Sequence, residues 1–381
     1  MGRPTYYEFF AGGGMARAGL GSSWKCLFAN DFDRKKGETY RANWGSEALL
    51  VGDVRTLETK QLPGHADLIW ASFPCQDLSL AGAGAGLAGA RSGTFWPFFD
   101  LVKKLRAEER GPKLLVLENV CGALTSHGGK DFSAICDALA NEGYNFGALV
   151  IDASLFLPQS RPRLFIVAVR EDVAVTSELI GQGAPSPFYT PGLVSAHAHL
   201  RAQTRKKWRW WRIAAPPKRN LSLAEIIEDE PTGVGWHSCE ETAGLIAKMS
   251  EINLARIAEA KKAGREIVGT AYRRTRYTSI GEKIQRAEAR FDNIAGCLRT
   301  PAGGSSRQFV LIVEKNRVRS RLISARETAR LMGLPEDYIL PENYNEAYHL
   351  TGDGVVVPAV RHVAAHLLEP LLRGARLRAA A

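Results

Sequence analysis

Cysteine pairs and long apolar runs are missing from this sequence of 381 residues. Its six cysteines are scattered and form no C-x-x-C pair, which argues against a zinc site and a disulfide framework and is typical of a reducing cytoplasm. No long uncharged apolar run predicts a transmembrane span, and residues 1–5 lead directly into an expected strand rather than a signal peptide. We therefore expect a cytoplasmic protein with no membrane segment and no metal site. No internal repeat is visible either.

Positive charge is concentrated in the middle of the chain. The formal net charge is +10, and residues 180–331 alone carry 27 Lys and Arg against 14 Asp and Glu. Phosphate backbones are the common partner of such a segment. The charge therefore favours a nucleic acid partner over the alternative, a basic surface that serves solubility only.

Apolar segments alternate with helical patterns over the first 170 residues. Strands are expected at 6–10, 25–30, 67–72, 113–118 and 163–169, and helices from 15 and at 34–43, 94–109 and 132–141. Strands separated by helices imply a largely parallel sheet with helices on both faces. The sequence therefore predicts an α/β protein with a doubly wound, mostly parallel sheet.

The alternation stops near residue 170 and irregular structure is expected beyond it, with helices at 241–263, 326–332 and 358–372. We expect the last helix to pack back on the first domain, which makes that domain discontinuous. The predicted domains are 1–178 plus 343–381, and a smaller, basic domain at 179–342.

Several short motifs follow expected strands, where ligands collect in open α/β sheets. The loop Phe10–Gly14 opens a helix and suits the anionic end of NAD, FAD or S-adenosylmethionine, or is only a tight turn. Asp31 and Asp53 each follow a strand and suit ribose hydroxyls or an adenine amino group. Taken singly, each aspartate is more often a helix cap or a loop residue.

Three further positions carry reactive or charged groups. Cys75 follows Phe73 and Pro74 at the end of an apolar strand, which presents a thiol at the strand's carboxyl end. Glu118 follows the apolar strand Leu114–Leu117. Partial desolvation there is expected to raise its pKa, which suits the group to act as an acid. The alternative is a solvated loop glutamate. Arg161 and Arg163 are expected to project the same way and to suit a phosphate, a carbonyl oxygen or a thiolate, or to form surface ion pairs.

In this order the motifs resemble those of the bacterial DNA cytosine-5 methyltransferases. The resemblance covers most of residues 5–170 and 318–372, and eight motifs in family order are highly specific although each alone is a modest signal. The motifs are Phe10-Ala11-Gly12-Gly13-Gly14, Phe28-Ala29-Asn30-Asp31, Gly52-Asp53-Val54, Pro74-Cys75-Gln76, Glu118-Asn119-Val120, Gln159-Ser160-Arg161-Pro162-Arg163, Arg326-Glu327-Thr328-Ala329-Arg330-Leu331-Met332-Gly333 and Gly352-Asp353-Gly354-Val355.

The resemblance implies an enzyme that flips a cytosine out of duplex DNA and methylates carbon 5 at a short specific sequence, using S-adenosyl-L-methionine. It implies that the Cys75 thiolate attacks carbon 6, that protonated Glu118 supports nitrogen 3, and that Arg163 holds the exocyclic oxygen. Arg161 would lie near the thiol and lower its pKa.

The resemblance also implies the cofactor contacts. The ring of Phe10 would lie beside the adenine, Asp31 on the ribose and Asp53 at the adenine amino group, with Phe32 on the other adenine face. Further contacts are expected from Gly12, Gly14, Val54, Pro74, Asp353 and Val355. Three residues depart from the family pattern: Glu8 replaces a more usual aspartate, Asp31 a frequent glutamate and Asp353 a frequent asparagine. The first two are expected to alter cofactor affinity.

Residues 179–317 lack a family-wide pattern and are expected to recognise the DNA target. Candidates for DNA contact are Gln76, Ser79, Arg273, Arg274, Arg276, Ser305, Arg307 and the basic-aromatic stretch 201–212, whose three tryptophans are equally compatible with a core. Gln76, Ser79 and the glycine-rich residues 81–86 are expected to form a mobile loop that closes over DNA.

Two alternatives are a tRNA cytosine-5 methyltransferase, which shares the same catalytic set, and an inactive DNA-binding regulator on the same fold, which is expected to lose the cysteine or the acid. The long basic insert favours duplex DNA over tRNA, and the presence of both Cys75 and Glu118 argues against the regulator. A dehydrogenase would leave the cysteine and the two arginines unexplained. We expect a monomer that acts on double-stranded DNA at the nucleoid; the existence of a cognate restriction endonuclease stays open.

Overall fold

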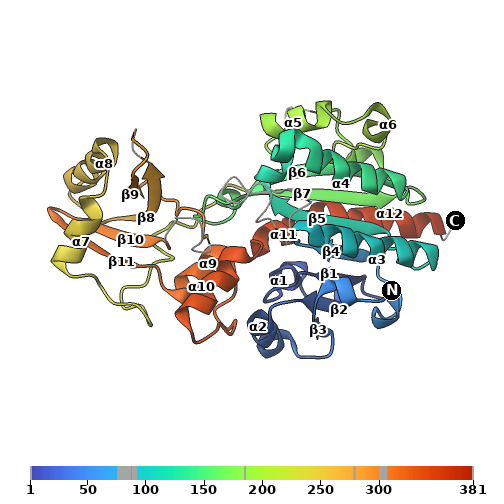
Figure 1. Cartoon of the computed structure of the whole chain (residues 1–381), viewed down its shortest axis with the longest axis horizontal. Helices are drawn as coiled ribbons and strands as arrows, with labels where there is room; N and C mark the ends of the chain where they lie inside the picture. Colours follow the sequence, from blue (N-terminus) through green and yellow to red (C-terminus); the bar gives the residue numbers. More distant parts are fainter. Residues whose placement is uncertain are drawn as a thin grey trace. The chain divides into compact units, whose positions relative to one another are not determined.

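A computed structural model describes residues 2–74, 87, 92–183, 186–277, 280–299 and 307–379. The chain divides into two compact units (Figure 1). Unit 1 comprises Met1–Asp152, Pro162–Pro217 and Val355–Ala381, and unit 2 comprises Ala153–Arg161 and Lys218–Gly354.

Unit 1 is built on a seven-stranded sheet with the order β3-β2-β1-β4-β5-β7-β6. The strands are β1 (Thr5–Phe9), β2 (Lys25–Asp31), β3 (Leu49–Val51), β4 (Leu68–Ala71), β5 (Leu114–Val120), β6 (Tyr144–Asp152) and β7 (Pro162–Arg170). The first five pair in parallel, and β7 runs antiparallel to both β5 and β6. The predicted doubly wound, mostly parallel sheet is confirmed. Its central strands carry long apolar runs, such as Leu68–Ala71 in β4 and Leu114–Leu117 in β5, because helices bury both faces.

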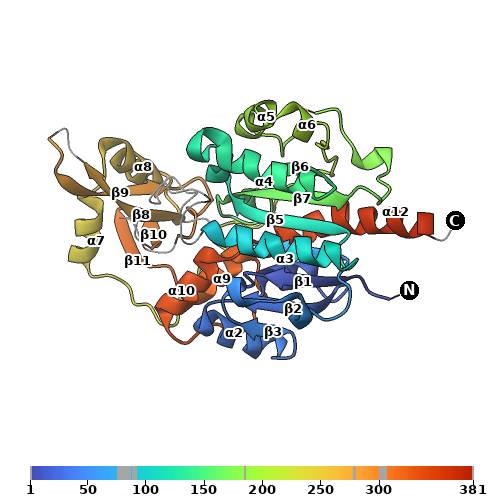
Figure 2. The ribbon, with the colours of Figure 1, turned by 45° about the vertical axis from the view of Figure 1, so that its right-hand side comes forward.

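Helices cover both faces of this sheet (Figures 1 and 2). They are α1 (Met15–Leu20), α2 (Arg34–Trp44), α3 (Phe95–Ala107), α4 (Lys130–Asn141), α5 (Pro191–Ala198), α6 (Ala202–Arg205), α11 (Val357–Val363) and α12 (Glu369–Ala379). The C-terminal α11 packs on α1 so closely that a Cβ at Gly19 would lie 2.4 Å from that of Val360. The guanidinium of Arg361 also donates to the Leu20 carbonyl at 2.9 Å. Only glycine at position 19 permits this approach.

Residues 179–217 belong to unit 1, whereas we predicted a second domain from residue 179. Two tryptophans explain the difference. Trp208 and Trp211 are buried, and the indole N–H of Trp211 donates to the Val167 carbonyl in β7 at 3.0 Å. Gly147 in β6 leaves room for this segment, since a Cβ there would lie 1.9 Å from the Arg209 carbonyl oxygen. The tryptophans are core residues.

Unit 2 contains a four-stranded antiparallel sheet with the order β11-β10-β8-β9, where irregular structure was expected. Its strands are β8 (Ile267–Tyr277), β9 (Lys283–Arg290), β10 (Phe309–Glu314) and β11 (Arg317–Leu322), and its helices are α7 (Cys239–Ile246), α8 (Glu251–Lys262), α9 (Ala325–Met332) and α10 (Tyr344–Asp353). The single helix predicted over 241–263 is two helices, because Met249 makes a β-bridge to Ala287 and Ser250 caps a new helix. The predicted helix ending at Gly333 is confirmed as α9.

One helical stretch, Tyr344–Gly374, is long and apolar enough to cross a membrane by length and composition, with a mean hydropathy of 1.3. Of that window, 61% is buried inside the protein. Core helices of soluble proteins pass the same test, so the stretch is weak support for a membrane span. Helix α10 ends at Asp353 and α11 begins at Val357, which interrupts the stretch.

Candidate active site

The glycine loop connects β1 to α1 through backbone conformations that side chains disfavour. Phe10, Gly12 and Gly14 have φ values of 57°, 55° and 80°. The Ala11 N–H donates to the Asn30 carbonyl at 2.9 Å, and the Gly12 N–H donates to the Asp31 carboxylate at 2.7 Å. A Cβ at Gly12 would meet no atom within 4 Å, so the backbone there is open to a ligand.

Trp44 of helix α2 packs against this loop and supports it. The indole N–H of Trp44 donates to the Gly13 carbonyl oxygen at 3.0 Å. A Cβ at Gly14 would lie 2.4 Å from the Trp44 indole nitrogen, so no larger residue fits. The Arg17 guanidinium lies 5.2 Å from the centroid of the same ring and donates to the Tyr40 hydroxyl at 2.9 Å. Sequence reasoning missed Trp44 and Tyr40, although both lie on the helix that follows Asp31.

Asp31 ends β2 and is only 9% exposed. Its two carboxylate oxygens accept from the backbone N–H groups of Gly12 and Asp33, and burial raises the pKa of the group. Phe32, the next residue, is 75% exposed, an unusual state for an aromatic ring. Asp53 accepts from the Arg55 N–H at 2.9 Å and caps the short 3₁₀ helix η1 (Val54–Thr56), in which Val54 is buried.

Glu8 is a carboxyl group in the core of β1, with 1% exposure. Its two oxygens have no hydrogen-bond partner among the described residues. Burial raises the pKa of Glu8 to about 8, against the opposing charge of Arg17. Burial therefore favours the protonated form of this side chain, which departs from the family pattern.

The reactive edge of the sheet lies at the ends of β4 and β5. Asn119 in β5 donates through its side-chain amide to the Phe73 carbonyl at 3.1 Å, which fixes the backbone just before Pro74. Phe73 itself is buried against Phe95, with ring centroids 5.3 Å apart. Asn119 was not singled out from the sequence as a positioning residue. Cys75, Gln76, Ser79, the glycine-rich residues 81–86 and Ser305 lie outside the described residues.

Glu118 and Arg163 form an ion pair at this edge. Antiparallel register places Arg163 opposite Val120 and Phe165 opposite Glu118, so the two charged residues share one face of the sheet. The Arg163 Nε lies 3.5 Å from Glu118 Oε1, and their side chains are only 15% and 8% exposed. Both side chains are thus held at the carboxyl end of β5 with little access to water.

Arg161 is held differently from Arg163, although we expected both to project the same way. It is 1% exposed and belongs to unit 2. Its guanidinium donates to the carbonyl oxygens of Leu298, Gly352 and Gly354 at 2.7–2.8 Å. The bonds to Gly352 and Gly354 hold the backbone at the end of α10 in place.

The remaining predicted residues lie in several places. Asp353 is the exposed last residue of α10, and Val355 is buried in unit 1. Arg307 packs over the rings of Tyr344 and Tyr348 and donates to Asn345. Arg273, Arg274 and Arg276 lie on β8 of unit 2.

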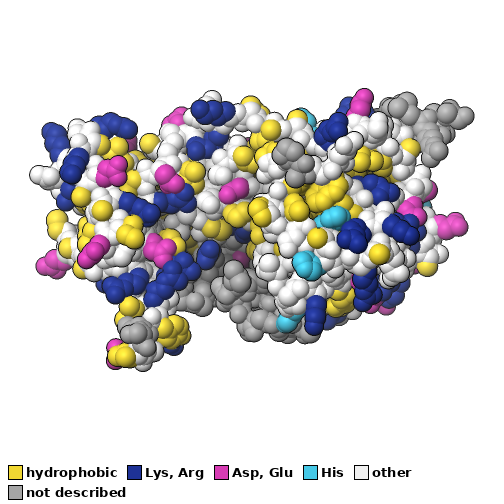
Figure 3. Space-filling model, turned by 90° about the horizontal axis from the view of Figure 1, so that it is seen from above, with side chains coloured by type: hydrophobic (Ala, Val, Ile, Leu, Met, Phe, Trp, Pro, Cys, Tyr) yellow, Lys and Arg dark blue, Asp and Glu magenta, His cyan; other side chains and the backbone are white. Residues whose placement is uncertain are grey.

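Basic side chains are present on both units, which corrects the expectation of a single basic domain. Residues 180–217 carry six Lys and Arg and no acidic residue, yet they belong to unit 1. On the face shown in Figure 3, Lys and Arg side chains lie on both the left-hand and the right-hand parts. The domain boundary differs from the one predicted at residue 179, because the burial of aromatic side chains rather than charge determines which hydrophobic core a segment joins.

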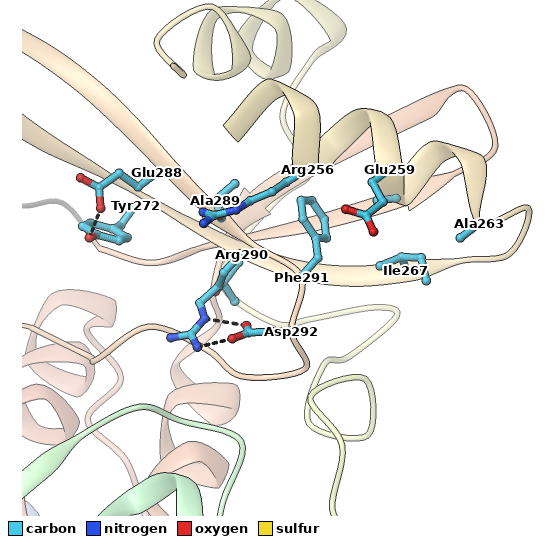
Figure 4. A pocket seen from close by; sticks show the side chains of 12 residues that line it. Arg256, Glu259, Ala263, Ile267, Tyr272, Glu288, Ala289, Arg290, Phe291 and Asp292 are labelled. Carbon is cyan, nitrogen blue, oxygen red and sulfur yellow. Dashed lines mark hydrogen bonds and ion pairs between the residues drawn. The ribbon is translucent and has the colours of Figure 1, made fainter. Parts of the chain in front are cut away.

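A pocket of about 630 Å³ lies in unit 2, between α8 and the root of the β8–β9 hairpin (Figure 4). Its lining includes Arg256, Tyr272, Glu288, Arg290 and Phe291. Arg290 pairs with Asp292 there at 2.6 Å, and the Tyr272 hydroxyl donates to Glu288. Of the predicted catalytic and cofactor residues that the structure describes, none lines this pocket.

Comparison with known protein families identifies the family to which this chain belongs. The model of the C-5 cytosine-specific DNA methylase family matches residues 5–369. The chain belongs to this family. The methylase is 27% identical to Type II methyltransferase M.BsuFI of Bacillus subtilis, over 97% of this chain and 73% of the relative. It is also 27% identical to M.HpaII of Haemophilus parainfluenzae, over 96% of this chain and 90% of the relative, and 25% identical to M.HhaI of Haemophilus parahaemolyticus, over 94% and 92%.

Solved structures show the same fold. The methylase matches an Entamoeba histolytica methyltransferase, EhMeth, with a TM-score of 0.63 at 14% identity, over 98% of this chain and 99% of that one. It matches the S. pombe Dnmt2 methyltransferase with a TM-score of 0.59 at 18% identity, over 97% and 99%. The protein is a DNA cytosine-5 methyltransferase that uses S-adenosyl-L-methionine, and the tRNA enzyme and the inactive regulator are not favoured.

Proposed function

We propose that Cys75, Glu118 and Arg163 carry out the methylation of cytosine in duplex DNA. The observation that carries this proposal is the Glu118–Arg163 pair, 3.5 Å apart and almost buried. Asn119, next to Glu118, holds the backbone that leads into Pro74 and Cys75. A carboxyl group and a guanidinium therefore lie at the edge of the sheet where the chain continues from Phe73 to Pro74.

In the proposed reaction, the target cytosine leaves the DNA stack, which costs a few kcal/mol and is offset by protein–DNA contacts. The Cys75 thiolate adds to carbon 6 of the ring. Protonated Glu118 donates to nitrogen 3, and Arg163 donates to the exocyclic oxygen, so that the negative charge developing in the ring is stabilised. The addition makes carbon 5 nucleophilic. Loss of the carbon 5 proton after methylation then expels the thiolate and restores the ring.

The residues around the glycine loop fit S-adenosyl-L-methionine. Gly12 leaves open space where a side chain would point, and Phe32 exposes an aromatic ring. The Asp31 carboxylate accepts from the Gly12 N–H and so lies beside this loop. We infer that Phe10, Gly12, Gly14, Asp31, Phe32, Asp53, Val54, Pro74, Asp353 and Val355 hold the cofactor. When bound, it supplies an electrophilic methyl group.

We also propose that Arg161 lowers the pKa of the Cys75 thiol, and its bonds to backbone carbonyl oxygens give it a positioning role as well. Its bonds to Gly352 and Gly354 fix the backbone on either side of Asp353. We further propose that Gln76, Ser79, Arg273, Arg274, Arg276, Ser305 and Arg307 contact DNA, and that the enzyme acts as a monomer on nucleoid DNA. Its Type II relatives favour a partner restriction endonuclease that cuts the same short sequence.

Transfer of a tritiated methyl group to mixed-sequence duplex DNA tests the proposal. Wild-type protein is expected to label the DNA, and the Cys75→Ser variant is expected to lose the label while it still binds the cofactor. Labelling of tRNA but not of duplex DNA by the wild type would contradict the proposed substrate. Full labelling by Cys75→Ser would contradict the proposed nucleophile.

A further inference from the structure

Residues 201–212, which we call the basic segment, have no part in the proposed methylation chemistry. They belong to unit 1 and lie along β6, the edge strand of its sheet. The Phe146 N–H donates to the Lys207 carbonyl at 3.0 Å, and the Arg209 N–H donates to the Phe146 carbonyl at 2.6 Å. The basic segment therefore covers the sheet edge at this point through backbone hydrogen bonds.

The basic segment meets the sheet at the end opposite the catalytic residues. Through β7, Phe146 stands level with Leu115, near the start of β5. Glu118 and Arg163 lie instead at the carboxyl end of β5, where Arg163 pairs with Ile151 of β6. The five residues from Phe146 to Ile151 span about 17 Å of strand. A base held by Glu118 and Arg163 thus lies at the other end of the sheet from the backbone of this segment.

The charge of the basic segment has one sign only. It contains six Lys and Arg, and residues 180–217 as a whole contain no Asp or Glu. Its exposed cations are Arg201, Arg205, Lys206 and Arg212. Two carboxylates from outside the segment reach it, because Asp137 lies 3.5 Å from Arg201 and Glu171 lies 2.5 Å from Lys207. Four of the six cations are outside these two ion pairs.

A cluster of aromatic rings holds the basic segment in place. The ring centroid of His197 lies 4.8 Å from that of Trp208 and 4.7 Å from that of Trp210, and the two indole rings are 5.3 Å apart. The Thr204 hydroxyl in α6 donates to Asp137 in α4, and Figures 1 and 2 show these two helices side by side. The backbone that carries the cations is therefore ordered before any ligand binds, which lowers the cost of binding.

A ligand of uniform negative charge fits this surface best. Protein surfaces usually intersperse charges of both signs, so an acidic protein partner would be matched by a segment that also contains carboxylates. Duplex DNA instead carries one negative charge per about 1.7 Å of its axis. Four of the six cations are arginines, whose planar guanidinium groups bind two phosphate oxygens at once.

We propose that the basic segment binds the phosphate backbone of a second DNA duplex, distinct from the duplex that is being methylated. This inference goes beyond the proposed function, which requires one duplex only. Contacts to phosphates carry no sequence information, so the second duplex needs no recognition site. A bound second duplex keeps DNA close to the enzyme between turnovers, which raises its effective concentration.

The test fills the target site first and then offers a second duplex. A short duplex that contains 5-fluorocytosine is expected to stay attached to Cys75 and to occupy that site. A fluorescent duplex of mixed sequence is then titrated into the trapped complex, and its anisotropy gives Kd as a function of salt. The wild-type complex is expected to bind this second duplex, with an affinity that falls steeply as salt rises.

A triple variant and a matched control locate the surface. Replacing Arg205, Lys206 and Arg212 by Gln is expected to weaken binding of the second duplex about a hundredfold at low salt and to reduce the slope of log Kd against log salt by about three. The control replaces Lys60, Lys103 and Lys104, three exposed cations elsewhere in unit 1, by Gln and is expected to bind like the wild type. All six side chains are exposed, so Tm should stay unchanged in both variants.

Three results would overturn the inference: no second duplex on the wild-type trapped complex, wild-type affinity in the triple variant, or an equal loss in the control. A failure to trap the first duplex would count against the proposed function alone. The number of duplexes bound by the untrapped protein then gives the same test, with two expected for the wild type and one for the triple variant.

Discussion

Trp44 and Gly13 are joined by a hydrogen bond of 3.0 Å from the indole N–H to the backbone carbonyl oxygen. The bond ties α2 to the glycine loop, at a point where Gly14 leaves no space for any larger residue. The loop's left-handed conformations are thus held by a neighbouring helix and not by the loop residues alone. Cofactor affinity should therefore depend on a side chain that does not itself contact the cofactor.

Trp44→Phe keeps the aromatic ring and removes only this donor. One hydrogen bond contributes about 1 kcal/mol net, so we expect cofactor affinity to fall about fivefold. Equilibrium dialysis with labelled S-adenosyl-L-methionine measures this change. Trp24→Phe is the matched control, because Trp24 donates to Glu369 at 3.2 Å, away from the loop. Equal affinities of the two variants would contradict the account of the loop.

Loss of the Glu118 carboxyl should affect the chemical step. Glu118→Gln keeps the size of the side chain but removes its acid, and general acids typically contribute 10²–10⁴-fold, so kcat is expected to fall about a hundredfold or more. Arg163→Lys removes the planar guanidinium and is expected to lower kcat in the same direction. Single-turnover methyl transfer measures both effects. Unchanged kcat in Glu118→Gln would contradict the proposed acid.

Arg321 and Glu327 form a fully buried ion pair in unit 2, and removal of one partner should destabilise the fold. Their side chains are 0% exposed, and Arg321 donates to both carboxylate oxygens of Glu327 at 2.6 and 2.8 Å. Glu327→Gln leaves a buried cation without its counter-charge, so the free energy of unfolding is expected to fall by about 3–5 kcal/mol.

The control for this change is Glu336→Gln, which breaks a surface pair with Arg330 at 2.7 Å. Exposed pairs contribute about 0–1 kcal/mol, so this variant should unfold almost like the wild type in urea. Similar losses in the two variants would show that burial does not set the strength of these pairs.

Glu8 should make stability depend on pH. Because burial raises its folded pKa to about 8, above its usual value of 4.5, its contribution is fully present below the unfolded pKa and is lost as pH rises through the folded pKa. We expect the wild type to lose stability between about pH 5 and pH 9. Urea unfolding should show a weaker dependence in Glu8→Gln, and no such change in Glu240→Gln, an exposed control. An identical pH profile in Glu8→Gln would contradict a buried neutral carboxyl.

Much of unit 1 was predictable because its strands are continuous apolar runs separated by amphipathic helices. Strand β6 was not expected, since Gly147 interrupts the apolar run of Tyr144–Asp152, and its pairing with β7 depends on contacts distant in sequence. The segment 179–217 was assigned to the wrong domain, because its charge is visible in the sequence whereas the burial of Trp208 and Trp211 is not.

The candidate active site, like the fold, could be predicted from the sequence only in part. Glu118 and Arg163 were expected to act together, and the register of β5 and β7 brings them to 3.5 Å. Arg161 lies only two residues away, yet its partners Leu298, Gly352 and Gly354 come from distant parts of the chain. Spacing along a strand predicts a shared face, but tertiary hydrogen bonds decide which group each side chain reaches.

Trapping of a covalent protein–DNA complex tests the central claim most directly. Fluorine at carbon 5 cannot leave as a proton does, so duplex DNA containing 5-fluorocytosine should stay attached to Cys75 after methyl transfer. The account predicts a denaturation-resistant complex with wild-type protein and cofactor, and none with Cys75→Ser. A complex that persists in Cys75→Ser, or none with a wild-type protein that methylates ordinary DNA, would contradict it.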